Sequence, residues 1–152
     1  MNKNIKSNKI AISACLLGVP CRYDGKCKLN RKAAKIFTSN KAIAICPEVL
    51  GGLAIPRPAC EIVGGDGNDV LDGNAKVLDK NDNDYAKKFI DGAKTALGII
   101  KKLEIKKVYL KSRSPSCGVN KIYNGTFADR TKSGCGVFAA ILKKENIELE
   151  EL

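Results

Sequence analysis

The chain of 152 residues contains no histidine, and no apolar run in it approaches the roughly 20 residues that cross a bilayer. Without histidine, no serine can be activated through a Ser-His-Asp triad, so any activation must come from a carboxylate, a lysine or a metal. The basic segment at residues 1–9 is followed by an apolar stretch at residues 10–14 that is too short for a signal peptide. We therefore expect a cytoplasmic protein with no membrane partner.

Seven cysteines are present, but no two of them form a Cys-x2-Cys pair. This absence excludes the usual zinc-finger and zinc-ribbon patterns, and the Cys-x2-Cys-x2-Cys run of a ferredoxin is missing too. An odd number of cysteines cannot pair fully within one chain, and a reducing cytoplasm disfavours structural disulfides. Metal binding or redox chemistry therefore explains the cysteines better than a disulfide framework does.

Three of the cysteines follow segments that read as buried strands. Cys15 and Cys46 each end a short apolar run, and Cys117 lies in the Ser/Pro/Gly-rich loop after the run at 108–110. Buried strands that alternate with amphipathic helices predict an α/β domain with a mainly parallel, Rossmann-like sheet flanked by helices. Ligands of such sheets lie beyond the carboxyl ends of the strands. The three thiols are thus expected at one edge, where they would suit a soft metal or an iron–sulfur cluster.

Helices are predicted where apolar residues recur at three- and four-residue steps. The clearest helix covers the apolar positions from 86 to 100, with Asp82 or Asn83 as its cap. Asn30 is expected to cap a further helix. The glycine-rich segment at 64–68 is typical of a tight turn.

The length suits one domain, which we expect to span residues 1–152 with mobile charged ends at 1–9 and 145–152. The net charge of +11 is concentrated at the start, where the first 35 residues contain nine Lys or Arg and one acid. Two interpretations stay open, a solvated Lys-rich surface or a field that attracts anions such as RNA. No basic stretch alternates with aromatic residues, so no stacking signature accompanies the charge.

A carboxylate and a group of hydroxyls lie next to these cysteines in the sequence. Glu48 closely follows Cys46 at a strand end, where it would suit proton transfer beside the thiolate, and a surface or loop-capping carboxylate is the other interpretation. The hydroxyls of Ser112, Ser114 and Ser116, with nearby backbone amides, can form an anion or oxyanion site. The other interpretation is that these serines only form the turn and have no part in a binding site.

The turn that begins at Arg22 offers two further candidates. Asp24 could carry a proton, and Arg22 could anchor a polar ring or a phosphate. Ordinary turn chemistry explains the Asp-Gly pair equally well. The other cysteines are either small buried hydrophobic residues or members of the site. They are Cys21, Cys27, Cys60 and Cys135.

Six motifs occur in order along the chain. They are Ser13-Ala-Cys-Leu-Leu-Gly18, Cys21-Arg-Tyr-Asp-Gly25, Ile45-Cys-Pro-Glu48, Gly51-Gly-Leu53 with Pro56-Arg57, Ser114-Pro-Ser-Cys-Gly118 and Ile122-Tyr-Asn-Gly-Thr-Phe127. Together they resemble the TudS-like thiouracil desulfidases, a bacterial family long labelled as a domain of unknown function. The resemblance implies a [4Fe-4S] cluster held by Cys15, Cys46 and Cys117. It also implies a fourth iron that has no protein ligand and accepts sulfur from the substrate.

The same resemblance implies non-redox desulfuration of a thiolated nucleobase, from thiouracil to uracil and hydrosulfide. Glu48 and Ser114 would then be the catalytic pair, with Asp24 as a helper. One alternative is the same chemistry on 4-thiouridine in tRNA, which the basic start of the chain favours. Another is a non-enzymatic zinc or thiol protein with a structural or redox-sensing role. The sequence leaves the exact substrate open, and also whether the protein is a monomer or a homodimer.

Overall fold

The computed structural model describes residues 9–152. In chain order the elements are β1 (Lys9–Ser13), η1 (Ala14–Leu17), α1 (Arg31–Ser39), β2 (Lys41–Ile45), α2 (Pro47–Leu50), β3 (Glu61–Val63), α3 (Gly67–Leu71), β4 (Lys76–Leu78), α4 (Ala86–Lys102), β5 (Lys107–Leu110), β6 (Lys121–Tyr123), β7 (Thr131–Ser133), α5 (Val137–Lys144) and β8 (Glu148–Glu151). Within this part of the chain, no helix is long and apolar enough to cross a membrane.

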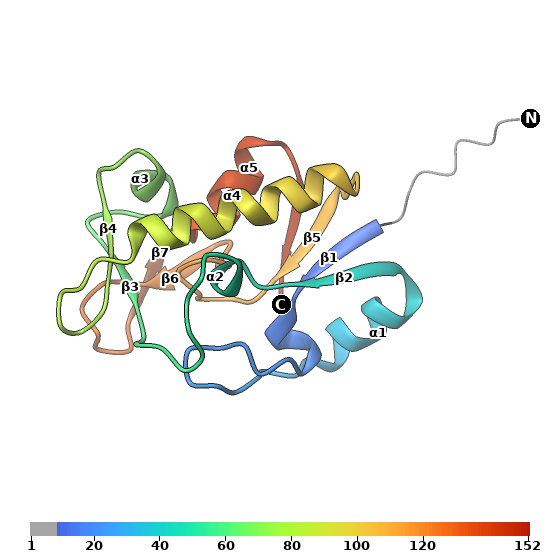
Figure 1. Ribbon diagram of the computed structural model, residues 1–152, viewed down its shortest axis with the longest axis horizontal. Coiled ribbons are helices and arrows are strands. Elements are labelled where there is room, and N and C mark those ends of the chain that lie inside the picture. Colours follow the sequence, from blue (N-terminus) through green and yellow to red (C-terminus); the bar gives the residue numbers. More distant parts are fainter. Residues whose placement is uncertain (1–8) are drawn as a thin grey trace, which may run out of the picture.

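The central sheet is parallel throughout. Within the described residues, four strands form it in the order β2-β1-β5-β8 (Figure 1). β1 therefore lies between β2 and β5, with Ile12 opposite Ala44 on one side and Tyr109 on the other. The pairs β3-β4 and β6-β7 form separate antiparallel ribbons. The predicted α/β domain with a mainly parallel sheet flanked by helices is confirmed.

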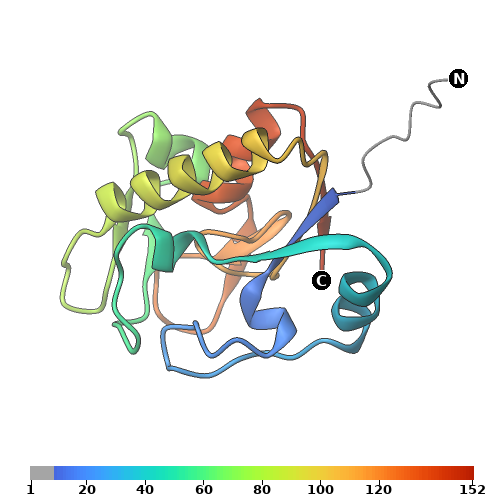
Figure 2. The same cartoon turned by 45° about the vertical axis from the view of Figure 1, so that its right-hand side comes forward.

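Helices cover both faces of this sheet. Figures 1 and 2 show α4 and α5 over one face and α1 against the other. Side chains alternate along β1, so Ile10 and Ile12 pack with Ala33 of α1, while Ala11 packs in the cluster that contains Phe138 of α5. Full burial of an isoleucine side chain contributes about 1.5–3 kcal/mol. This burial on both faces explains why β1 reads as a continuous apolar run.

The helix caps agree with the sequence in one case and differ in another. Asn30 caps α1 as expected, because its side chain accepts a backbone N–H of the first turn at 3.0 Å. The predicted cap of α4 at Asp82 or Asn83 is wrong, since the helix begins only at Ala86. The residue before the helix is Tyr85, whose side chain makes no capping contact, and the Oδ1 of Asp84 accepts the Ala86 N–H at 2.9 Å.

The C-terminal segment also differs from its prediction. The expected mobile end at 145–152 is wrong, because this segment includes β8, which pairs in parallel with β5. The strand was not recognised in the sequence because most of its residues are charged. These charges are paired in the structure, where Glu150 lies 3.0 Å from Lys32 and 3.1 Å from Lys107. Charged side chains are common on edge strands, where they discourage pairing with another chain. The other expected mobile end, 1–9, falls outside the described residues except for its last, which begins β1.

Candidate active site

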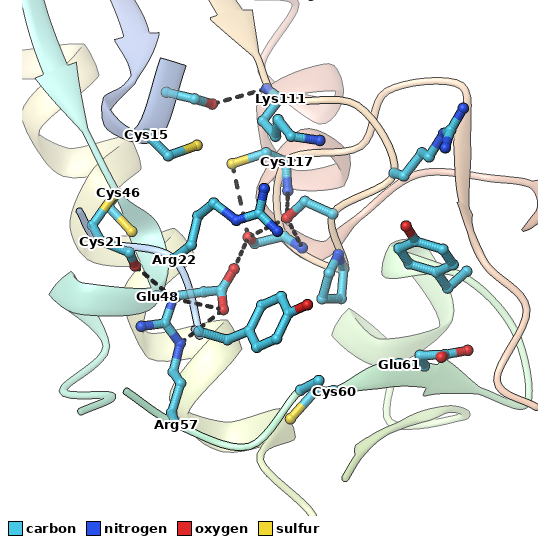
Figure 3. A pocket seen from close by; sticks show the side chains of 18 of the residues that line it. Cys15, Cys21, Arg22, Cys46, Glu48, Arg57, Cys60, Glu61, Lys111 and Cys117 are labelled. Carbon is cyan, nitrogen blue, oxygen red and sulfur yellow. Dashed lines mark hydrogen bonds and ion pairs between the residues drawn. The ribbon is translucent and has the colours of Figure 1, made fainter. Parts of the chain in front are cut away.

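A cavity of about 380 Å³ lies at the edge of the sheet where β1, β2 and β5 end (Figure 3). Its wall combines the segments that follow these three strands with side chains from loops elsewhere in the chain. Most of the site residues predicted from the sequence line it. They are Cys15, Arg22, Cys46, Glu48, Ser112, Ser114, Ser116 and Cys117.

Adjacent strand ends bring the three predicted thiols together. Cys15 lies in η1 directly after β1, Cys46 directly follows β2, and Cys117 lies in the loop after β5. Because β1 runs between β2 and β5, each thiol enters the cavity from a neighbouring position along the sheet edge. Figure 3 shows their sulfur atoms gathered on one side of the cavity, with Cys21 beside Cys46 and Cys60 farther away.

Burial and mutual contact raise the pKa of three thiols of this cavity, Cys21, Cys46 and Cys117. The interaction with Cys15 above all, together with burial, raises the pKa of Cys21 to about 11. Contact with Cys21, followed by burial, raises the pKa of Cys46 well above its usual value. Burial raises the pKa of Cys117 to about 12. A metal that binds here must therefore displace protons, as is usual for thiolate ligands.

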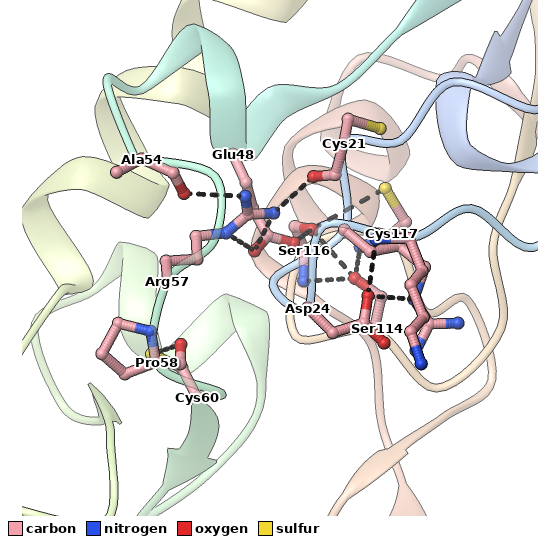
Figure 4. Close-up of polar contacts among 12 residues, drawn as sticks. Cys21, Asp24, Glu48, Ala54, Arg57, Pro58, Cys60, Ser114, Ser116 and Cys117 are labelled. Atoms are coloured by element: carbon pink, nitrogen blue, oxygen red, sulfur yellow. Dashed lines mark hydrogen bonds and ion pairs between the residues drawn. The ribbon is translucent and has the colours of Figure 1, made fainter.

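Glu48 is fixed between two side-chain partners (Figure 4). It lies in α2, which begins directly after Cys46 with a proline at its first position, a favourable place for proline because its missing N–H has no helical partner. Its Oε2 accepts a hydrogen bond from Ser116 Oγ at 2.7 Å, and its Oε1 lies 3.2 Å from both Nε and Nη2 of Arg57. The sequence predicted neither partner of this carboxylate.

The serine loop forms a directed chain of hydrogen bonds that ends at this carboxylate. Ser114 Oγ accepts the backbone N–H groups of Ser116 at 3.1 Å and Cys117 at 3.0 Å, and it lies 2.9 Å from Ser116 Oγ. Because the Ser116 hydroxyl donates to Glu48, its oxygen is free to accept the Ser114 proton. The expected pair of Glu48 and Ser114 is thus connected through Ser116 rather than in direct contact.

The remaining predicted residues lie at the margin of the site. Asp24 is not part of the cavity wall, and its Oδ1 accepts the Lys26 N–H at 3.0 Å in a local turn. The same oxygen lies 3.6 Å from Nε of Arg22, which does line the cavity. Ser112 also lines it, and the Ser112 carbonyl accepts a hydrogen bond from Lys111 Nζ at 2.9 Å. The structure thus gives Asp24 a turn contact and places Arg22 and Ser112 at the cavity.

Comparison with known proteins places the chain in a family. Residues 10–151 match the family model described as 2-thiouracil desulfurase. The chain belongs to this family. A protein of Bacillus subtilis (strain 168), "Uncharacterized protein YbbK", is 43% identical over 135 residues, which cover 89% of both sequences. The solved structure of the [4Fe-4S]-dependent thiouracil desulfidase TudS matches with a TM-score of 0.82 and 37% identity, covering 95% of this chain and 90% of that one.

Membership of the 2-thiouracil desulfurase family confirms the resemblance that the sequence motifs indicated, and makes the protein an enzyme. The donor set of its cavity fits an iron–sulfur cluster, because three soft thiols enter from three different elements. Across residues 9–152, no three His, Cys, Asp or Glu side chains are arranged to hold a single metal ion.

This desulfurase-family cavity also contains residues that the sequence did not single out. Arg57 and Lys111 line it, and burial lowers the pKa of Lys111. Glu61 lies in the wall too, where its Oε1 accepts the backbone N–H of Gly125 at 3.0 Å and of Phe127 at 3.3 Å. Glu61 thus holds the loop that carries an aromatic side chain of the wall. Arg57 stands within one of the six motifs and Lys111 beside another, which is the signal that could have found them.

Proposed function

We propose that the protein is a desulfidase that converts thiouracil, or a closely related thiolated nucleobase, to uracil and hydrosulfide with a [4Fe-4S] cluster. The observation that carries this proposal is the single cavity in which three strand-end thiols meet a carboxylate joined to two serines. Membership of the 2-thiouracil desulfurase family and the similarity to TudS support it. A cytoplasmic location remains part of the proposal.

Three thiolates are enough to hold the cluster and leave one position open. Cys15, Cys46 and Cys117 would be the ligands, each provided by the segment that follows a different strand of the parallel sheet. A cluster with four irons and three protein ligands would have one iron without a protein ligand. When bound, the cluster supplies a thiophilic, Lewis-acidic position for the thiocarbonyl sulfur.

Glu48 and the serines would handle the protons of this reaction. Glu48 accepts a proton from water as the water oxygen bonds to the thiocarbonyl carbon and the carbon–sulfur bond breaks. The water provides the new carbonyl oxygen and the proton of hydrosulfide, so neither an oxidant nor a reductant is consumed. The chain from Ser114 through Ser116 to Glu48 orients the carboxylate and offers a path for the proton. General acid–base catalysis of this kind contributes about 10²–10⁴-fold to a rate.

A second candidate substrate is 4-thiouridine within tRNA. The nine Lys and Arg among the first 35 residues favour it, because clustered positive charge attracts the phosphate backbone. Tight RNA binding that weakens steeply with salt would support this substrate, and absence of RNA affinity at low salt would remove it. The non-enzymatic zinc or thiol protein considered from the sequence is wrong, because the chain belongs to the 2-thiouracil desulfurase family and is similar to a solved desulfidase.

The first experiment measures iron, acid-labile sulfide and zinc after anaerobic purification and reconstitution, followed by 2-thiouracil turnover. We expect about four irons and four sulfides per chain, the content of this cluster type. Cys46→Ser should lose the cluster and the activity, whereas Cys27→Ser, at an exposed cysteine, should keep both. Stoichiometric zinc without iron in the reconstituted protein would contradict the proposal.

The second experiment tests the proton acceptor. Glu48→Gln removes the negative charge but keeps the size of the side chain, so we expect an unchanged iron content and a kcat that falls about 10²–10⁴-fold. Glu104→Gln, at an exposed position after α4, is the matched control. Full turnover in Glu48→Gln with a normal cluster would show that another group accepts the proton.

A further inference from the structure

Arg57 joins several segments of the site through one side chain, which is only 5% exposed. From its guanidinium, Nε donates to Glu48 Oε1 at 3.2 Å, Nη2 to the Cys21 carbonyl at 2.9 Å and Nη1 to the Ala54 carbonyl at 3.2 Å (Figure 4). Its backbone N–H donates to the Tyr23 carbonyl at 2.8 Å. The loop between α2 and β3 is thereby attached to the turn after η1 and to the carboxylate in α2.

The guanidinium is held in a fixed plane before it meets the carboxylate. Its donors form a rigid planar fork, and the carbonyls of Cys21 and Ala54 occupy two of its three nitrogens. The edge formed by Nε and Nη2 is then directed at Oε1 of Glu48, with both distances at 3.2 Å. Rotation of the carboxylate would break these contacts, so the other oxygen, Oε2, stays on the side of Ser116.

We propose that Arg57 is the positioning residue for Glu48, fixing the carboxylate so that Oε2 receives the serine chain and faces the reacting water. This inference rests on the proposed role of Glu48 as proton acceptor. Each nitrogen of the guanidinium has a protein partner, and Glu48 is the one side chain among these partners, so we expect Arg57 to act on the reaction through this carboxylate. A carboxylate that is misplaced by about 1 Å can lose about 10²-fold in rate.

The test compares Arg57→Gln and Arg57→Lys in the cluster-loaded enzyme with the wild type. We expect kcat for 2-thiouracil to fall about 10²-fold in Arg57→Gln, with KM within about twofold and iron content unchanged. Arg57→Lys should lose only about tenfold, because an ammonium keeps the charge but cannot reach all three acceptors at once. Arg31→Gln, at the exposed start of α1, is the matched control and should keep the wild-type kcat.

The double variant Glu48→Gln/Arg57→Gln separates positioning from a structural role. If Arg57 acts through Glu48, the second change should alter the residual kcat of Glu48→Gln by no more than about twofold. Independent losses in the double variant would overturn the inference. So would an iron content that falls together with kcat in both Arg57 variants, since Arg57 would then serve the thiol loop.

The remaining outcomes distinguish this inference from the proposed function. Wild-type kcat in Arg57→Gln, alongside a strong loss in Glu48→Gln, would overturn only the positioning role. Wild-type kcat in Glu48→Gln would overturn the role of Glu48 itself, and the role of Arg57 with it. Thermal unfolding of each variant shows whether it is folded and loaded with the cluster under the assay conditions, so that the kcat values can be compared.

Discussion

At the scale of single residues, the structure places a further group between the two side chains that the family resemblance names as the catalytic pair. The buried Ser116 lies between Ser114 and Glu48 and donates to the carboxylate at 2.7 Å. Both serines stand in the same motif, and their relative placement depends on the loop conformation. In that loop Arg113 has a φ of 64°. This left-handed conformation is uncommon for arginine, so the sequence does not predict it.

Removal of the Ser116 hydroxyl should therefore interrupt the connection while leaving the loop intact. In Ser116→Ala, Ser114 Oγ still accepts its two backbone N–H groups, but Glu48 Oε2 loses its donor. We expect kcat to fall about 10²-fold at unchanged iron content, the lower end of the range for proton-transfer groups. Ser133→Ala in the exposed part of β7 is the control. A wild-type kcat in Ser116→Ala would show that the serine chain carries no proton and does not orient Glu48.

At the scale of elements, α2 is positioned by direct backbone contact with α4. A Cβ atom on Gly92 would collide with the carbonyl oxygen of Pro47, and one on Gly51 would collide with the carbonyl oxygen of Lys88. Glycine is required at both places by space, because neither residue has a positive φ. The short helix that carries Glu48 is thus held at a fixed distance from the longest helix of the described chain.

Two glycines of α4 form a matched pair for testing this contact. Gly92→Ala should destabilise the protein by about 1–3 kcal/mol, as overpacking typically does, and should also lower kcat because α2 must move. Gly98 has nothing within 4 Å of its would-be Cβ, so Gly98→Ala should stabilise the helix by about 0.5–1 kcal/mol. Urea unfolding and steady-state kinetics measure both effects. Equal stability of the two variants would contradict a tight α2–α4 contact.

The sequence predicted the long or fully apolar elements and missed the short or charged ones. β1 and α4 were found because burial requires continuous apolar residues or a 3.6-residue period, and β2 was found from its apolar run although it is an edge strand in which only Ile45 is buried. α3 was missed, and its first two residues fell within the predicted turn at 64–68, although Asp66 and Asp69 form a capping box at its start. β8 has only one apolar residue, Leu149, and its pairing with β5 depends on distant parts of the chain. Such elements are stabilised by tertiary contacts more than by their own residues.

At the scale of the whole molecule, the strand order brings cysteines that are far apart in the sequence close together in space. Strand-end placement made the thiol set predictable, since the carboxyl ends of parallel strands share one edge. The order β2-β1-β5, which places Cys15 between Cys46 and Cys117, comes from the crossovers and not from any local motif. The role of Arg57 was not predicted, because it depends on the path of an irregular loop. The sequence of such a loop has no periodic pattern from which its path could be inferred.

Stability of the whole molecule should depend on acidic pH, because two carboxyl groups bind protons less readily in the folded state. The amide of Asn83 above all, together with backbone N–H groups of Asn83 and Asn81, lowers the pKa of Asp79 below its ordinary 3.8. The Lys32 ammonium, followed by that of Lys107, lowers the pKa of Glu150 below its ordinary 4.5. Both contributions are complete above these ordinary values and disappear as the pH falls through the lowered ones.

Asp79→Asn should therefore reduce the pH dependence of the free energy of unfolding. It should also lower that free energy at neutral pH. The four-residue loop after Asp79 depends on its carboxylate, and an amide offers one acceptor oxygen in place of two. Urea midpoints measured from pH 7 to pH 3 should fall steeply in the wild type and less in Asp79→Asn. Asp91→Asn, on the exposed face of α4, is the control and should keep the wild-type slope. Parallel curves for Asp79→Asn and the wild type would show that this carboxylate binds protons equally in the folded and unfolded chain, so that its hydrogen bonds do not favour the charged form.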